Sequence, residues 1–222
     1  MSTVIIAGAS GVVGSRVLRS VLARLDVDRV VALGRRPLPV AHPKLDSVTT
    51  DLQDPHDIAS SIPGGTMIAF CCLGTTLATA GSREAFRAVD LDAVMAFATA
   101  ARERGVGHFL LVSSLGADRP RNNFYLQTKA AAEVAVAQVG FARLTILRPS
   151  FIDDHGTRPD HRPVERVMLP LARLIFRVIG RTNRYAPISA DVIARAMVRL
   201  AFHPRGEQVR IVESDALHAL GA

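Results

Sequence analysis

Apolar and polar residues follow two alternating patterns along the chain. The first apolar run, residues 4–7, is continuous and β-branched, which predicts a central parallel strand covered on both faces. Similar runs predict further strands at residues 29–33, 45–50, 66–72, 106–113, 144–147 and 208–212. The pattern therefore predicts a sheet of about seven strands.

Between these runs, apolar residues recur at helical spacing. The spacing predicts helices at residues 12–25, 55–61, 83–104, 122–139, 164–179 and 191–202. Ser82 is expected to cap the long helix 83–104, and Gly105 is expected to end it. Strands and helices in this alternation indicate an α/β fold with a doubly wound parallel sheet, which binds ligands at the carboxyl ends of its strands.

The pattern changes after residue 150. Residues 152–163 predict a polar loop that contains proline, and the helix 164–179 carries an apolar stripe beside arginines. We interpret residues 151–188 as a small helical cap over the substrate, within a single domain that spans residues 1–222. A basic amphipathic helix of this kind also suits a membrane surface, which is the alternative interpretation.

The composition is that of one soluble globular domain. The 222 residues are 49% hydrophobic, which is ample for a single core. There is neither a secretory signal nor an apolar stretch of membrane-spanning length, so we expect a cytoplasmic protein without integral membrane association. Cys71 and Cys72 are adjacent, which is typical of a reducing compartment, and the histidines show no metal-ligand spacing. No metal site is expected.

The formal charge of +7 comes almost entirely from arginine, because Lys44 and Lys129 are the two lysines of the chain. The arginines are spread over the whole sequence, and the chain has no tryptophan and two tyrosines, so nucleic-acid binding is not expected. A basic surface of this kind favours a small ligand that carries phosphate.

A glycine turn follows the first strand. In the sequence GASGVVG, Gly8 allows a tight turn, Gly11 lets a pyrophosphate approach the backbone, and Gly14 lets the next helix pack closely. The N-terminus of that helix attracts an anion. We predict a nucleotide-binding turn made of Gly8, Ala9, Ser10, Gly11, Val12, Val13 and Gly14; the alternative is a strand-to-helix turn without a ligand.

Arginines follow the second strand, where a dinucleotide-binding unit meets the adenosine ribose. Arg35 and Arg36 suit a 2′-phosphate, and the position that is acidic in NAD-binding units is Gly34 here. The sequence therefore favours NADP(H) over NAD(H). The alternative is that both arginines decorate an ordinary loop.

Two other strand ends carry further candidate cofactor contacts. Asp51, followed by Leu52, lies where a carboxylate reaches the amine of adenine, although an ordinary loop aspartate that caps the next helix is an alternative. The segment Cys72, Leu73, Gly74 and Thr75 is expected to run beside the cofactor's ribose, with Gly74 permitting close approach. Both cysteines are interpreted as small buried strand residues.

The candidate catalytic pair is Tyr125 and Lys129. Four residues apart on a helix, they share one face. An ammonium beside a phenol favours the phenolate, so the pair suits a tuned acid for a carbonyl oxygen. Ser113 and Ser114 end the fifth strand, where either hydroxyl suits a substrate oxygen; Ser114 is favoured because the chain is already leaving the strand there.

The motifs GASGVVG, LGRRP, TTDLQD, FCCLGTT, LVSSLGA, YLQTK and ILRPS together resemble the atypical short-chain dehydrogenase/reductases, particularly the Tat-interacting oxidoreductase homologues. The resemblance runs from about residue 4 to residue 212. It implies a Rossmann fold that binds NADPH, with Tyr125 as proton donor and Lys129 bonded to the nicotinamide ribose. It also implies that Ser113 or Ser114 fills the serine position and that Arg148 approaches the cofactor or substrate.

The first functional hypothesis is an NADPH-dependent oxidoreductase that acts on a small carbonyl or alcohol substrate. A sugar-nucleotide epimerase or dehydratase is disfavoured, because the roughly seventy residues after the sixth strand leave little room for a sugar-nucleotide domain. The alternative from a different class is an NADPH-binding regulatory protein that senses cofactor. The helices 83–104 and 122–139 suit a homodimer or another protein partner as well as packing in a monomer.

Overall fold

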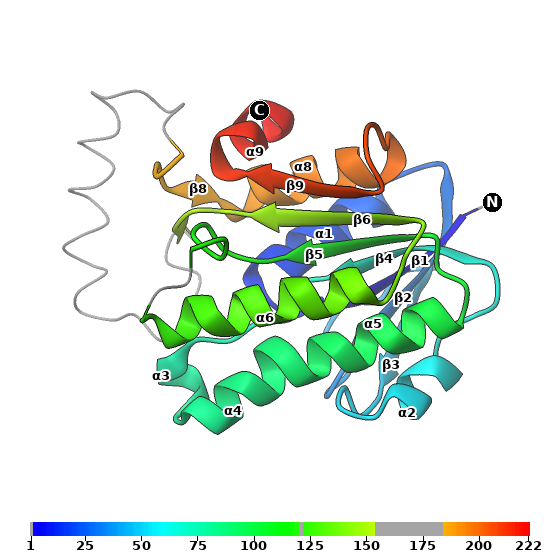
Figure 1. Cartoon of the computed structure of the whole chain (residues 1–222). Coiled ribbons are helices and arrows are strands. Elements are labelled where there is room, and N and C mark those ends of the chain that lie inside the picture. The colour runs from blue at the N-terminus through cyan, green and yellow to red at the C-terminus, as the bar shows by residue number, and fades with distance from the viewer. Residues whose placement is uncertain (1, 120–121, 154–183) are drawn as a thin grey trace.

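The computed structural model describes residues 2–119, 122–153 and 184–222. Its central element is a seven-stranded sheet with the order β3-β2-β1-β4-β5-β6-β9, in which neighbouring strands are parallel (Figure 1). The strands are β1 (Ser2–Ala7), β2 (Val27–Gly34), β3 (Leu45–Thr49), β4 (Thr66–Cys71), β5 (His108–Val112), β6 (Arg143–Arg148) and β9 (Val209–Glu213). The predicted α/β fold with a doubly wound parallel sheet is confirmed.

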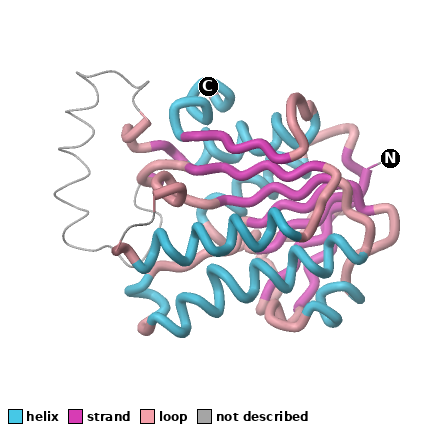
Figure 2. The backbone as a smooth tube through the Cα atoms, viewed as in Figure 1, coloured by secondary structure: helices cyan, strands magenta, loops and turns pink. Residues whose placement is uncertain are grey.

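Helices cover both faces of the sheet (Figure 2). One face packs against α2 (Pro55–Ser60), α5 (Ala93–Glu103) and α6 (Phe124–Gln138), around a core that includes the buried rings of Phe97 and Phe109. The other packs against α1 (Val12–Leu22), α8 (Ala190–Phe202) and α9 (Ser214–Gly221). The central strands β1, β4, β5 and β6 are therefore largely buried on both faces, whereas the edge strands β3 and β9 are partly exposed.

The helix predicted at 83–104 differs from the structure in one respect. It begins as α4 (Arg83–Arg87), passes through a π-helical turn, η1 (Ala88–Asp92), and continues as α5. Ser82 caps it as expected, because its hydroxyl accepts the N–H of Ala85 at 3.1 Å, and Gly105 follows its end with a φ of +80°. A short helix that was not predicted, α3 (Leu77–Ala80), precedes it.

The C-terminal part also departs from the prediction. Where a loop was predicted from residue 152, a short strand β7 (Ile152–Asp153) pairs with β8 (Ile188–Ser189). Helix α9 was not predicted either. The predicted helix 164–179 and most of the predicted cap lie outside the described residues. Within the described part of the chain, no helix is both long and apolar enough to cross a membrane.

Candidate functional site

The glycine turn lies where the strand order reverses. β1 has β2 on one side and β4 on the other, so the chain winds outward first in one direction and then in the opposite one. In open sheets of this kind, ligands bind outside the carboxyl ends of the strands at that point. The strands end at the side of the molecule where α6 begins (Figure 1).

Packing around the turn demands glycine at two positions. Gly8 has a φ of +84°, and a Cβ there would lie 2.5 Å from the carbonyl oxygen of Cys72. A Cβ on Gly14 would lie 2.1 Å from the carbonyl oxygen of Gly8. The turn is therefore pressed between the first turn of α1 and the chain that leaves β4.

The N-terminus of α1 fits a pyrophosphate. Its N-cap is Gly11, no side chain caps the helix, and its first turn holds no acidic residue. The positive end of the helix dipole is therefore not offset by a neighbouring carboxylate. The sequence-predicted turn residues come together here.

The adenosine-side candidates lie at the adjacent strand ends. Arg35 and Arg36 follow β2 and are both exposed. Leu52 is buried, whereas Asp51 is exposed and its side chain accepts the N–H of Gln53 at 2.9 Å. The alternative that Asp51 caps the next helix is wrong, because the cap of α2 is Asp54.

The chain after β4 lies beside the glycine turn. Cys71 is fully buried, and burial raises the pKa of its thiol to about 12. Cys72 is partly buried, and burial raises the pKa of its thiol as well. Both thiols are therefore protonated near neutral pH. The prediction of a small buried strand residue is confirmed for Cys71 and is wrong for Cys72, which follows the end of β4 and is only partly buried.

The predicted tyrosine-lysine pair lies on the first turns of α6. Tyr125 packs its ring against that of Phe86, with centroids 5.6 Å apart. The Nζ atom of Lys129 lies 2.7 Å from Oδ1 of Asp90, and the N–H of Thr75 donates to Oδ2 of Asp90 at 2.8 Å. Burial lowers the pKa of Lys129, but the Asp90 carboxylate, together with Tyr125 and Cys71, raises it, so the pKa lies above its usual range. Lys129 is therefore a buried cation.

The two candidate serines have different environments. Ser113 is buried, and its hydroxyl donates to the carboxylate of Glu133. Ser114 is half-buried, and its hydroxyl makes one long bond, 3.4 Å, to the carbonyl oxygen of Leu115. The Ser114 hydroxyl is thus held less tightly by hydrogen bonds within the protein than the Ser113 hydroxyl.

Arg148 is enclosed by carboxylates. Its Nη2 and Nε atoms lie 2.6 and 3.0 Å from the two oxygens of Glu133, and its Nη1 lies 3.1 Å from Glu213. The side chain is buried, so these contacts neutralise a charge held away from water. Its described contacts are to protein carboxylates, and its expected approach to a cofactor or substrate stays a prediction.

Comparison with known proteins assigns the family. A family described as NAD(P)H-binding matches residues 8–204, which include the glycine turn, the tyrosine-lysine pair and Arg148. The chain belongs to this NAD(P)H-binding family. It therefore binds a nicotinamide dinucleotide.

Relatives in this NAD(P)H-binding family match over nearly the whole chain. Protein HTATIP2 from Rattus norvegicus is 33% identical over 99% of this chain and 89% of its own length. Protein FMP52, mitochondrial, from Eremothecium gossypii is 30% identical over 97% of this chain and 96% of its own length. Nearly the full length of both relatives is thus represented here.

Solved structures show the same fold at low sequence identity. The Bordetella bronchiseptica enzyme WbmH, in complex with NAD+, has a TM-score of 0.72 and 17% identity over 96% of this chain and 76% of its own. The oxidoreductase ylbE from Lactococcus lactis has a TM-score of 0.68 and 18% identity over 98% of this chain and 96% of its own. At this level of identity, these matches show that the chain shares the fold of both proteins, while the expected resemblance to the Tat-interacting oxidoreductase homologues is confirmed by HTATIP2.

Two residues of this NAD(P)H-binding chain's site were not predicted from the sequence. Asp90 is fully buried against Lys129, and Glu133 is 5% exposed between Ser113 and Arg148. Each has a sequence signal, because Asp90 lies between the apolar Val89 and Leu91 and Glu133 continues the four-residue spacing of the tyrosine-lysine pair.

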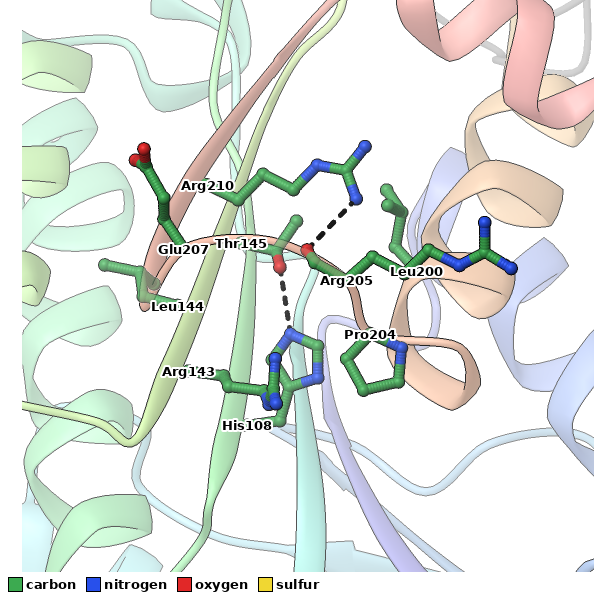
Figure 3. Close-up of a pocket in the computed structure, with 9 residues that line it drawn as sticks. All are labelled: His108, Arg143, Leu144, Thr145, Leu200, Pro204, Arg205, Glu207 and Arg210. Carbon is green, nitrogen blue, oxygen red and sulfur yellow. Dashed lines mark hydrogen bonds between the residues drawn. The ribbon is translucent and has the colours of Figure 1, made fainter.

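A small hollow lies at the amino ends of the strands, where β5 and β6 begin (Figure 3). Its volume of about 10 Å³ suits roughly one water molecule. The imidazole Nε2 of His108 and the hydroxyl of Thr145 meet there at 2.9 Å. The hollow is too small for a nucleotide. Its lining residues are His108, Arg143, Leu144, Thr145, Leu200, Pro204, Arg205, Glu207 and Arg210.

Proposed function

We propose that this protein is an NADPH-dependent oxidoreductase that interconverts a small carbonyl compound and its alcohol, with Tyr125 as the general acid and base. The observation that carries the proposal is the buried Lys129 cation, which shares a face of α6 with Tyr125 at the carboxyl end of the sheet. The family's nicotinamide cofactor supports it further.

Each residue of the proposed site has a definite part in the reaction. Bound NADPH supplies the hydride for reduction, and Tyr125 delivers a proton to the developing alkoxide oxygen. Lys129 places a positive charge beside the phenol, which favours the phenolate left behind. Ser114 is proposed to hold the substrate oxygen by a hydrogen bond, since the hydroxyl of Ser113 is bound to Glu133.

Replacement of Tyr125 by phenylalanine tests this role. General acid catalysis is worth about 100-fold or more, so Tyr125→Phe should lower NADPH oxidation by at least that factor across a panel of aldehydes and ketones. NADPH binding, measured by fluorescence titration, should be unchanged. Turnover retained by this variant would contradict the mechanism. A wild-type protein that binds NADPH and reduces no member of the panel would instead indicate the cofactor sensor.

We propose that Arg35 and Arg36 select NADPH over NADH by binding the 2′-phosphate. A charge-assisted hydrogen bond contributes about 1.5–3 kcal/mol, so Arg35→Ser/Arg36→Ser should weaken NADPH binding by roughly tenfold or more and leave NADH binding unchanged. Calorimetric titration with both cofactors measures this. Arg143→Ser/Arg205→Ser removes the same two charges from exposed arginines at the amino ends of the strands, and it controls for net charge. Equal binding of NADH and NADPH by the wild-type protein would refute the assignment.

We propose that residues 151–188 form the substrate-facing segment of a single domain. Its described ends support this, because the hydroxyl of Ser150 donates to the carbonyl oxygen of Ala186 and Arg184 lies 3.6 Å from Glu213 at the carboxyl end of β9.

Cytoplasmic localisation also stays a prediction, and the fungal relative FMP52 is named mitochondrial.

A further inference from the structure

Asp90 is a buried carboxylate that takes part in no step of the proposed reaction. It is fully inaccessible and lies in the π-helical turn η1, which faces α6. A π-helical turn inserts a residue into the helical repeat, which redirects the side chains there. The result here is a carboxylate aimed at the catalytic helix.

The two oxygens of Asp90 join two separate parts of the site. Oδ1 lies 2.7 Å from the Nζ atom of Lys129 on α6, and Oδ2 accepts the N–H of Thr75, which follows β4, at 2.8 Å. A Cβ placed on Gly74 would lie 3.4 Å from Oδ1 of Asp90 and 3.5 Å from Nζ of Lys129. The ion pair therefore lies directly beneath the backbone that leaves β4.

Burial makes Lys129 dependent on a counter-charge. Its side chain is 9% exposed, and an ammonium in that environment loses hydration that only a paired anion offsets. The ionisable groups that act on it are Asp90 from η1, Cys71 from β4 and Tyr125 from its own helix. Cys71 is a neutral thiol, because burial raises its pKa to about 12, and Tyr125 is the proposed proton donor. Asp90 is therefore the fixed counter-charge.

We propose that Asp90 is a positioning residue, which clamps the Lys129 ammonium between α6 and the chain after β4 and keeps it charged beside Tyr125. Asp90 acts on the reaction through Lys129. The proposal rests on the proposed function for its effect on turnover, while the clamp itself is a property of the protein alone.

The lysine content of the chain allows a direct test. Lys44 and Lys129 are its two lysines, so a Lys44→Arg background leaves a single lysine signal after labelling with [ε-¹³C]lysine. The carbon shift reports the charge of Lys129 as pH rises. We expect the charged-state shift to persist beyond the usual titration range of lysine with Asp90 present. In Asp90→Asn the midpoint should fall by at least about one pH unit, because desolvation then acts without the Asp90 counter-charge.

Asp92→Asn is the matched control. It makes the same change in the same π-helical turn, but Asp92 is exposed, so the Lys129 midpoint should not move. If Asp90→Asn does not fold, as judged by circular dichroism, Asp90→Ser repeats the neutralisation with a smaller side chain. An unshifted Lys129 midpoint in a folded Asp90 variant would overturn the proposal.

A second readout separates this proposal from the proposed function. NADPH oxidation by Asp90→Asn should fall at least about tenfold while NADPH binding is retained, and Asp92→Asn should match the wild type. An unshifted midpoint together with Tyr125-dependent turnover would reject the clamp and leave the function standing. A shifted midpoint in a protein that reduces no carbonyl would support the clamp and reject the proposed function.

Discussion

His108 is a titratable residue that the fold keeps neutral. It lies at the amino ends of the strands, away from the candidate site. It begins β5, is 6% exposed, and shares a hydrogen bond with Thr145 of β6. Burial lowers the pKa of its imidazole from 6.5 to about 4. The unfolded chain, in which His108 titrates normally, therefore binds a proton at a higher pH than the folded protein does.

That difference predicts a pH dependence of stability. The contribution of neutral His108 is complete above about pH 6.5 and is lost as the pH falls toward 4, because the unfolded state then gains the proton first. Its size is up to about 3 kcal/mol. Urea unfolding of His108→Gln, which cannot titrate, should show a flatter dependence between pH 6.5 and 4 than the wild type.

The exposed His56 provides the control for this prediction. His56→Gln removes a histidine from the surface of α2 and should leave the wild-type pH dependence intact. An identical slope for His108→Gln and wild type would contradict the assignment of a neutral buried imidazole.

At the scale of elements, α6 places three polar side chains of the candidate site on one face. Tyr125, Lys129 and Glu133 follow one another at four-residue spacing, so they form a row along the helix. Each meets a different element: Phe86 of α4, Asp90 of η1 and Arg148 of β6. The row ties the helix to its neighbours at the end where the chemistry is proposed.

The Glu133–Arg148 contact predicts a large effect on stability. Removing one partner of a buried ion pair leaves an uncompensated charge, which costs about 3–5 kcal/mol. Glu133→Gln should therefore lower the free energy of unfolding by about 3 kcal/mol in urea denaturation, because Glu213 still offsets part of the Arg148 charge. The double variant Glu133→Gln/Arg148→Met should be less destabilised than the two single effects added together.

Glu103→Gln is the control for that measurement. Glu103 is an exposed glutamate at the end of α5, so its replacement should change the free energy of unfolding by less than about 0.5 kcal/mol. If Glu133→Gln behaves like Glu103→Gln, the buried ion cluster does not stabilise the fold.

At the scale of the whole molecule, the strand order builds the site. The reversal at β1 places β4 beside it, and the N–H of Cys72 donates to the carbonyl oxygen of Ala7 at 2.9 Å. The chain that leaves β4 consequently lies against the glycine turn on one side and the Asp90–Lys129 pair on the other. The glycine turn and helix α6 are thus joined through one short segment.

The sequence by itself determined what depends on near neighbours. Continuous apolar runs predicted the strands, Gly8 and Gly14 predicted the tight turn, and the four-residue spacing predicted that Tyr125 and Lys129 share a face. Each of these follows from backbone geometry over a few residues. Within the described residues, the predicted bounds differ from the observed ones by only a few residues, except where η1 interrupts the long helix and where α3, β7, β8 and α9 were missed.

The tertiary structure decided which distant residues meet. Asp90 forms an ion pair with Lys129, and Glu133 accepts a hydrogen bond from the hydroxyl of Ser113 and contacts Arg148. These contacts form because sheet order and helix packing bring separate segments together. A charge in an apolar helix has no visible partner in the sequence, since the partner is chosen by topology and not by spacing. The burial that makes these contacts strong arises only when the chain is folded.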